Sequence, residues 1–169
     1  DIAIMRALPG LRIFAPCDET ETEALVSQMI AEPAPSYLRL DKSKVKKKGL
    51  EKFSKGKLRR MLLGKQVALV AYGGIVNEAI TAAEQLQAND ISCSVYSAHT
   101  IKPFDAKSLI ELARKYNAVI TMLCFLVGKS LIHDNSVGLK FDIDDHTNSP
   151  SLLNSSIAHA YGCCSILSP

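Results

Sequence analysis

The clearest pattern in the chain is an alternation of strand-like and helix-like apolar spacings. Residues 67–71 are apolar without interruption, which predicts a strand that is covered on both faces. A Gly-Gly pair follows this strand, and Asp105 can cap the second of the two predicted helices. The β-α-β-α-β order predicts an α/β fold with a doubly wound, mostly parallel sheet over residues 66–122. The five predicted elements lie at 67–71, 75–86, 91–96, 105–116 and 118–121.

A shorter unit precedes this one, over residues 1–42. Residues 11–14 and 37–40 predict two strands, and Asp18 predicts the start of a helix between them, with Glu21 as a capping-box partner. Strand, helix and strand in this order predict a parallel β-α-β unit with a right-handed crossover. The predicted helix places four apolar residues on one face: Ala24, Leu25, Met29 and Ile30.

A basic segment over residues 43–65 connects the two units. Ten lysines and arginines lie between Lys42 and Arg60, and few acidic residues offset them. Such a run can contact nucleic acid, but it has no interleaved aromatic residue beyond Phe53, so a solvated linker is favoured. Its end, residues 57–63, predicts a strand that turns at Gly64-Lys65 and forms a hairpin with residues 66–71.

Residues 123–169 differ from the rest of the chain. The apolar run continues to Val127, and then polar residues, serine and asparagine become frequent. We expect an atypical tail here, with no repeat and no heptad pattern.

Composition limits the class of protein. The 169 residues are 47% hydrophobic and 22% charged, which is the balance of a soluble globular chain. No run of about 18 apolar residues predicts a membrane span, and no signal peptide is visible, so no membrane partner is expected. The first residue is Asp1 rather than Met, which suggests an excerpt or a processed chain. Five cysteines without a CxxC pair fit a reduced, cytoplasmic compartment.

The sequence offers few candidate binding sites, and each also has a purely structural interpretation. Gly73-Gly74 stands where a phosphate-binding loop would, but without GxGxxG spacing a tight turn is favoured. His99 and Lys102 follow a strand, where α/β proteins often bind ligands, yet a shaped turn is the simpler interpretation. Arg39, near a strand end, could bind a phosphate in bidentate fashion or form a surface salt bridge.

Two further clusters are weaker candidates for a metal or redox site. The polar stretch that contains Asp142, Asp144, Asp145 and His146 has metal-binding side chains, but it lacks the glycine and the final glutamate of a calcium loop. Cys163-Cys164 suggests neither zinc nor a redox pair. We therefore predict no metal site in this chain.

Five short stretches resemble the transketolase family. Residues 1–10, 15–18 and 37–40 are similar to the end of its pyrimidine-binding domain, and residues 70–76 and 99–105 are similar to its C-terminal domain. The motifs occur in the family's order over about residues 1–121. They are most similar to the separate C-terminal subunit of split transketolases.

The resemblance implies a function for the complete enzyme. In this family thiamine diphosphate, with Mg²⁺, lies between a diphosphate-binding domain and a pyrimidine-binding domain, and two-carbon ketol units move between sugar phosphates. The diphosphate-binding domain, the activating glutamate and the substrate-binding histidines have no counterpart in this chain. The resemblance implies that Arg39 contacts the sugar phosphate. It implies no other site residue.

Several expectations follow from this resemblance. The chain alone should bind no cofactor and should be inactive without a diphosphate-binding part or subunit, and the complete enzyme should be a homodimer. Residues 123–169 lack the acidic segment and the glycine-rich stretch with which the family continues. The alternatives are a non-catalytic assembly module, a truncated gene product, or an enzyme similar to 1-deoxyxylulose-5-phosphate synthase.

Overall fold

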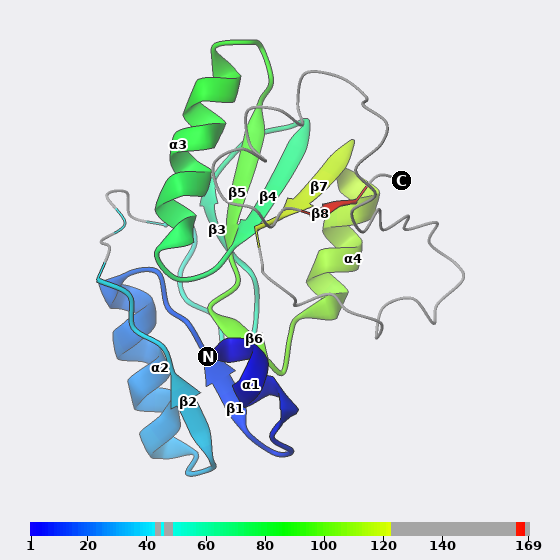
Figure 1. Ribbon diagram of the computed structural model, residues 1–169. Coiled ribbons are helices and arrows are strands. Elements are labelled where there is room, and N and C mark those ends of the chain that lie inside the picture. Colours follow the sequence, from blue (N-terminus) through cyan, green and yellow to red (C-terminus); the bar gives the residue numbers. More distant parts are fainter. Residues whose placement is uncertain (43–44, 46–48, 123–164, 168–169) are drawn as a thin grey trace.

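The computed structural model describes residues 1–42, 45, 49–122 and 165–167 (Figure 1). They form two units, each with its own sheet. The N-terminal unit contains α1 (Ile2–Ala7), β1 (Arg12–Phe14), α2 (Glu19–Ala31) and β2 (Ser36–Leu38). The C-terminal unit contains β3 (Arg59–Leu62), β4 (Val67–Ala71), α3 (Ile75–Gln87), β5 (Cys93–Ser97), β6 (Thr100–Lys102), α4 (Ala106–Lys115), β7 (Ala118–Thr121) and β8 (Ser165–Leu167). Within the described parts of the chain, no helix is long and apolar enough to cross a membrane.

The predicted α/β fold is confirmed. In the C-terminal unit the strand order is β3-β5-β4-β7-β8, and β4 runs parallel to both β5 and β7. Every residue of β4 is buried, as its unbroken apolar run predicts. Alternate residues of β4 belong to two different hydrophobic clusters, one with α3 and the other with α4. The two helices therefore cover opposite faces of the sheet, which is the doubly wound arrangement.

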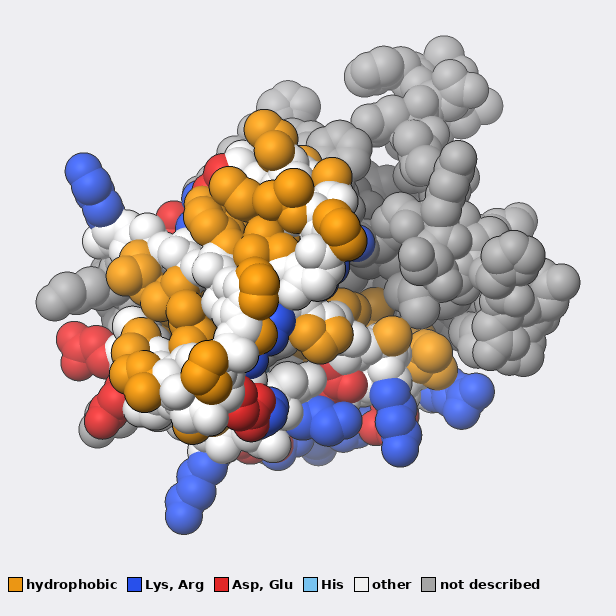
Figure 2. Space-filling model, turned by 90° about the horizontal axis from the view of Figure 1, so that it is seen from below, with side chains coloured by type: hydrophobic (Ala, Val, Ile, Leu, Met, Phe, Trp, Pro, Cys, Tyr) orange, Lys and Arg blue, Asp and Glu red, His pale blue; other side chains and the backbone are white. Residues whose placement is uncertain are grey.

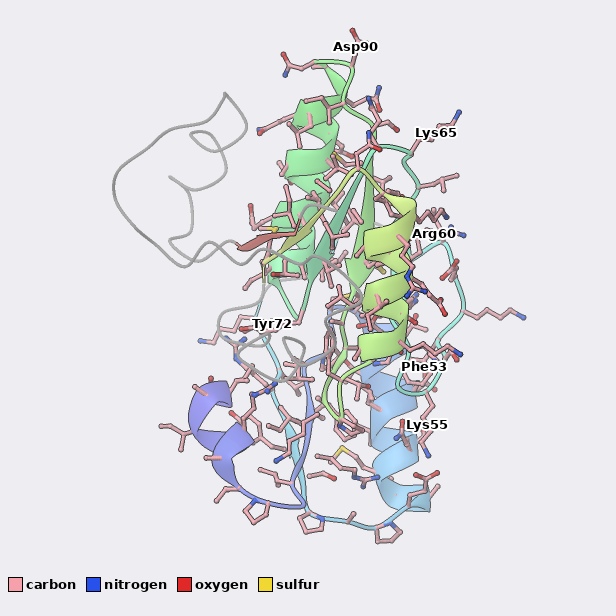
Figure 3. The ribbon with its side chains drawn as sticks, turned by 90° about the vertical axis from the view of Figure 1, so that its right-hand side faces the viewer. Phe53, Lys55, Arg60, Lys65, Tyr72 and Asp90 are labelled. Atoms are coloured by element: carbon pink, nitrogen blue, oxygen red, sulfur yellow. The ribbon has the colours of Figure 1, made fainter. Side chains whose placement is uncertain are left out.

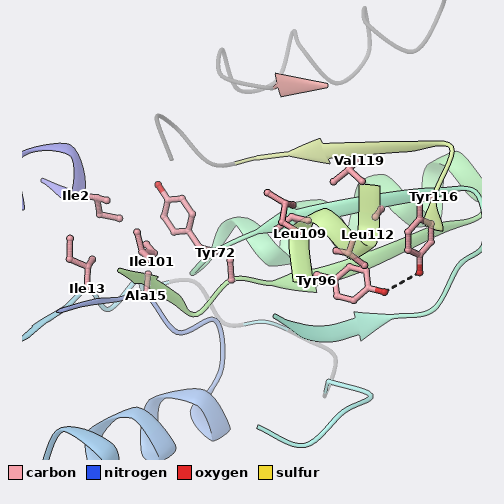
Figure 4. Close-up of a cluster of buried hydrophobic side chains, with 13 residues drawn as sticks. Ile2, Ile13, Ala15, Tyr72, Tyr96, Ile101, Leu109, Leu112, Tyr116 and Val119 are labelled. Atoms are coloured by element: carbon pink, nitrogen blue, oxygen red, sulfur yellow. Dashed lines mark hydrogen bonds between the residues drawn. The ribbon is translucent and has the colours of Figure 1, made fainter. Parts of the chain in front are cut away.

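The cluster on the α4 face extends into the N-terminal unit (Figure 4). Ile2 and Ile13 belong to it together with Leu109. It also encloses two tyrosines, whose hydroxyls hydrogen-bond each other at 3.0 Å: Tyr96 and Tyr116. Burial and the bond to Tyr116 raise the pKa of Tyr96, whereas burial of Tyr116 is outweighed by its hydrogen bonds with Ser94 and Tyr96, which lower its pKa.

The N-terminal β-α-β prediction is also confirmed. Strands β1 and β2 pair in parallel, with Arg12 opposite Ser36, and α2 connects them. The Asp18 carboxylate accepts from the Glu21 N–H at 2.8 Å and caps α2 as predicted. Leu25 is fully buried, but Ile30 is 74% exposed, so the predicted apolar face is only partly covered.

The predicted hairpin between residues 57–63 and 66–71 is wrong. Strand β3 forms, but it pairs antiparallel with β5 rather than with β4. Both edges of β4 are occupied by parallel neighbours, and β3 is left at the edge of the sheet. Gly64 makes this path possible: both its backbone N–H and its carbonyl hydrogen-bond the Ser94 hydroxyl, and a side chain there would meet the backbone of Cys93.

One strand of the C-terminal unit belongs to the other sheet. The sequence predicted a turn at residues 99–103, whereas β6 forms there and pairs antiparallel with β1, giving the order β2-β1-β6. The N-terminal unit is thus extended by a strand that follows β5 in the chain. This pairing ties the two units together through backbone hydrogen bonds.

Candidate functional site

Arg39 lies just after β2, where the two units meet. Its Nε is 3.4 Å from an Asp1 carboxylate oxygen, and its Nη2 is 3.1 Å from Asp41. The guanidinium also lies 5.9 Å from the centre of the Tyr72 ring, which comes from the C-terminal unit (Figure 3). The Arg39 side chain is 29% exposed. The Arg39 guanidinium, which we predicted to bind a phosphate, is therefore partly accessible to solvent. It lies between the carboxylates of Asp1 and Asp41.

Asp41 connects Arg39 to the start of α3. One of its carboxylate oxygens pairs with Arg39, and the other accepts from the Gly74 N–H at 2.9 Å. Gly73 has φ +53°, and a Cβ there would lie 2.6 Å from the Asp41 carboxylate. The Gly73-Gly74 pair thus forms a tight turn in which the Gly74 N–H already binds a carboxylate of the same chain and the Gly73 N–H donates to the Ala15 carbonyl.

His99 is completely buried where the two units meet. Its Nδ1 lies 2.9 Å from the Thr100 hydroxyl, its ring lies 4.6 Å from the Phe53 ring between centres, and its Nε2 has no hydrogen-bond partner. Burial lowers its pKa, although the charge of Glu21 acts in the opposite direction. A neutral imidazole without access to solvent is part of the core rather than an anion-binding group.

Lys102 does not lie beside His99 as a ligand pair. Its Nζ donates to the carbonyls of Arg6 and Leu8, at 3.0 and 2.6 Å, at the end of α1. A lysine at a helix C-terminus satisfies carbonyls that have no partner within the helix. The structure therefore separates the two residues that the sequence placed in one candidate site.

A buried polar cluster that sequence reasoning missed lies at the start of α2. The Glu21 carboxylate is fully buried, and it accepts from the Cys17 N–H at 2.9 Å and from the Ser97 hydroxyl at 3.0 Å. Arg59 Nη1 contacts Asp18 at 2.7 Å and Glu21 at 3.2 Å. Burial alone would lower the pKa of Arg59, but the hydrogen bond and charge of Asp18, with the charge of Glu21, raise it.

This cluster contains side chains of metal-binding type but does not suit a metal. Ligand atoms of Cys17, Asp18 and Glu21 lie within 4.8 Å of one another. Burial and the charge of Glu21 raise the pKa of the Cys17 thiol, so it stays protonated. Arg59 already supplies a cation to both carboxylates. Mg²⁺ prefers oxygen ligands and retained waters, so this thiol-containing site does not fit it.

The N-termini of the described helices do not suit the diphosphate group of thiamine diphosphate either. A diphosphate is commonly bound by the free N–H groups at a helix N-terminus. Each of the four helices in the described ranges begins against an aspartate of the chain itself. These are Asp1, Asp18, Asp41 (through Gly74) and Asp105 for α1, α2, α3 and α4. A diphosphate at any of them would meet a carboxylate already in place.

Two sets of candidates remain outside the described residues. They are the aspartates near His146 and the Cys163-Cys164 pair. The absence of a metal site there stays a prediction.

Two family models match the chain in consecutive stretches. The model of the transketolase pyrimidine-binding domain matches residues 1–48, and that of the transketolase C-terminal domain matches residues 55–123. The boundary between the two matches falls in the basic segment.

Individual relatives agree with these matches. The chain is 35% identical over 123 residues to a 6-deoxy-6-sulfo-D-fructose transketolase subunit of Clostridium sp. (strain MSTE9), covering 72% of this chain and 38% of that protein. It is 32% identical over 131 residues to the 1-deoxy-D-xylulose-5-phosphate synthase of Paraburkholderia phymatum, covering 72% and 20%.

A solved structure shows the same relationship. The chain of a split-gene transketolase, described as an inactive β4 tetramer, superposes with a TM-score of 0.63 at 35% identity, over 70% of this chain and 40% of that one. The present chain spans at most about two fifths of the length of these three relatives. It belongs to the transketolase family and contains sequence of the pyrimidine-binding domain followed by the C-terminal domain.

Proposed function

We propose that this chain supplies the C-terminal part of a thiamine-diphosphate-dependent, transketolase-like enzyme of the cytoplasm. The complete enzyme would transfer two-carbon ketol units between sugar phosphates, and this chain would be inactive without a diphosphate-binding part. The observation that carries the proposal is the pair of consecutive family matches over residues 1–48 and 55–123. The similarity to a split-gene transketolase chain supports a separate partner subunit.

The cofactor would bind outside the described residues. Thiamine diphosphate and Mg²⁺ belong to the complete enzyme under this proposal. The carboxylates at the N-termini of the four described helices support it, because a diphosphate at any of them would meet a negative charge. The partner would therefore hold the cofactor.

A surface for that partner lies on the N-terminal unit. Five of the seven large apolar side chains exposed in the described residues belong to it: Ile4, Leu8, Val26, Ile30 and Leu40. Hydrophobic side chains gather at this end of the molecule, which Figure 2 shows from below. Such exposure suits a protein contact, whether with the diphosphate-binding part or with a second copy in a homodimer.

Arg39 would contact the phosphate of the sugar. It lies at the carboxyl end of a parallel strand, where α/β folds commonly bind ligands, and its guanidinium suits a phosphate oxygen pair. Asp41 is fixed by Gly74, and Asp1 is fixed by the Ile2 N–H and the Tyr37 hydroxyl. A phosphate would therefore approach the partly exposed side of the guanidinium, beside both carboxylates.

A graft tests both parts of the proposal. The full chain would replace the matching C-terminal region of the split-gene transketolase subunit, and the hybrid would be assayed with its partner subunit, cofactor and phosphorylated sugars. We expect ketol transfer by the hybrid and none by the chain alone. Arg39→Gln should raise KM for phosphorylated ketoses about 10-fold or more with a smaller change in kcat.

Other outcomes would favour the alternatives. A hybrid that assembles with its partner but forms no product would indicate a non-catalytic assembly module. Formation of 1-deoxy-D-xylulose 5-phosphate and CO2 when pyruvate is added to the assay as the two-carbon donor would instead favour the synthase, to which the chain is also similar. An unchanged KM in the Arg39→Gln hybrid would contradict the phosphate role of Arg39.

A further inference from the structure

Glu21 is the centre of the buried polar cluster between the two units. It lies in the first turn of α2, yet none of its surface is exposed. Its carboxylate is shared by the Cys17 N–H of the N-terminal unit and by Ser97 and Arg59 of the C-terminal unit. Partners for one buried charge therefore come from both units.

Burying this carboxylate is costly unless it is paired and hydrogen-bonded. In the N-terminal unit alone, Glu21 would retain the Cys17 N–H and the favourable start of α2, but neither Arg59 nor Ser97. Docking of the C-terminal unit removes water from Glu21 and supplies those two partners at once. The burial of Glu21 thus depends on the presence of Arg59.

Arg59 is held in a matching way. Its side chain is 4% exposed, and its Nε donates to the Glu51 carbonyl at 2.9 Å. Gly49 leaves the room for it, because a Cβ on Gly49 would lie 2.6 Å from the Arg59 guanidinium. The residues just before β3 therefore hold the Arg59 guanidinium in the position from which it contacts α2.

Backbone contacts join the same two surfaces beside the cluster. The Ala15 N–H donates to the His99 carbonyl at 2.9 Å, and the Gly73 N–H donates to the Ala15 carbonyl at 3.1 Å. These bonds can form only when the end of β1 meets both loops of the C-terminal unit. They give the ion pair a fixed geometry.

We propose that the Glu21–Arg59 pair is a buried lock that makes the two units of this chain open and unfold together. The two units are joined because the charges of Glu21 and Arg59 pair with each other, and a buried charge without its partner does not join them. Loss of Arg59 leaves the buried Glu21 carboxylate without its cation at the junction, and the N-terminal unit then opens without the C-terminal unit.

Hydrogen exchange of the full chain, followed by mass spectrometry, tests the lock. In the unmodified protein we expect peptides of α2 and of β4 to exchange through the same opening. Arg59→Met should speed exchange in α2 and β2 by about 10–100-fold while β4 and β7 stay protected. Arg60→Met, on the neighbouring residue of β3, is the matched control and should leave the α2 peptides unchanged.

Two further variants keep the test decisive if Arg59→Met folds poorly. Gly49→Ala should displace Arg59 without altering its charge and should speed α2 exchange in the same way. Glu21→Gln combined with Arg59→Met should be no worse than Arg59→Met alone, because the double variant lacks the fully buried Glu21 charge and Asp18 loses Arg59 in both variants alike. Equal acceleration in both units, α2 exchange matching the Arg60→Met control, or additive effects in the double variant would overturn the lock.

Discussion

Gly73 lies beside Asp41, just before the start of α3. Its φ of +53° suits glycine, and any Cβ would lie 2.6 Å from the Asp41 carboxylate. Gly10 offers a matched comparison, because its φ is +71° but no atom lies within 4 Å of the Cβ position. The two glycines separate the cost of backbone strain from the cost of displacing Asp41.

We predict that Gly73→Ala destabilises the protein more than Gly10→Ala does. The left-handed conformation costs alanine about 1–2 kcal/mol at either position, and loss of the Asp41–Gly74 hydrogen bond adds about 1 kcal/mol at Gly73. Urea unfolding followed by far-UV circular dichroism measures both, since the chain has no tryptophan. Equal losses in the two variants would show that Asp41 moves without cost.

His99 should make stability depend on pH. Burial lowers its folded-state pKa below the unfolded value of about 6.5. The unfolded state therefore binds more protons as pH falls through about 6.5, so the stability present above this pH is lost on acidification. We predict that His99→Gln loses less stability than the unmodified protein between about pH 7.5 and 5.5.

Chemical denaturation at several pH values measures this difference. Both proteins keep the other three histidines, so their contributions cancel. Parallel pH profiles for the two proteins would show that the acid sensitivity arises elsewhere.

Single residues differ in how far the sequence predicts them. The aspartates that cap α2 and α4 act as predicted, because a cap depends only on residues within one turn. The inward turn of Glu21 was not predictable: the capping-box pattern directs it toward its own helix start, whereas Arg59 lies 38 residues away in the chain. The run of basic residues around Arg59 conceals the arginine that pairs with the buried Glu21.

Among the elements, α4 shows a cap that also fixes a strand. Asp105 accepts from the Ser108 N–H at 3.2 Å and from the Leu58 N–H, next to β3, at 3.2 Å. Burial opposes the charge of Asp105, but the bonds to Ser108 and Leu58 and the charge of Lys57 lower its pKa. One carboxylate thus holds the start of α4 against the start of β3.

We predict that Asp105→Ala costs about 2–3 kcal/mol, since it removes the helix cap and leaves the Leu58 N–H without a partner. Lys107→Ala, at an exposed position of the same helix, is the control and should change stability by less than about 0.5 kcal/mol. Thermal unfolding followed by circular dichroism compares them. A loss no larger than that of the control would contradict the dual role of Asp105.

Strand pairing was the least predictable property of the elements. The patterns locate β3 and β4 correctly, but they contain no information on which strand lies beside β3. A short connection favours a hairpin, yet the parallel crossover from β4 to β5 leaves the outer edge of β5 open, and β3 pairs there. The pairing of β6 with β1 is likewise a contact between distant segments.

At the scale of the whole molecule, the two units meet along one edge. The carboxyl ends of β1 and β2 face the C-terminal unit, which contributes Gly74, Arg59 and the backbone of His99 to the contact. This edge is where parallel sheets commonly bind ligands, and here most of its polar groups bind the other unit instead. Arg39 is the partly exposed residue of this edge for which the resemblance implied a role.

The sequence predicts this site only in part. It identifies Arg39 through a family motif, but it does not show that Asp1 and Asp41 lie on either side of the guanidinium. Asp41 is held near Arg39 by its hydrogen bond with the Gly74 N–H, and Asp1 reaches Arg39 because α1 packs against β1, the strand beside β2. Such neighbours depend on the assembled fold.

The measurement that tests the account most directly is a calorimetric titration of the full chain with thiamine diphosphate and Mg²⁺. The account predicts no binding heat up to about 1 mM cofactor, because carboxylates occupy the N-termini of the four described helices. Binding with a micromolar Kd would contradict it, since this chain would then hold the cofactor without a partner.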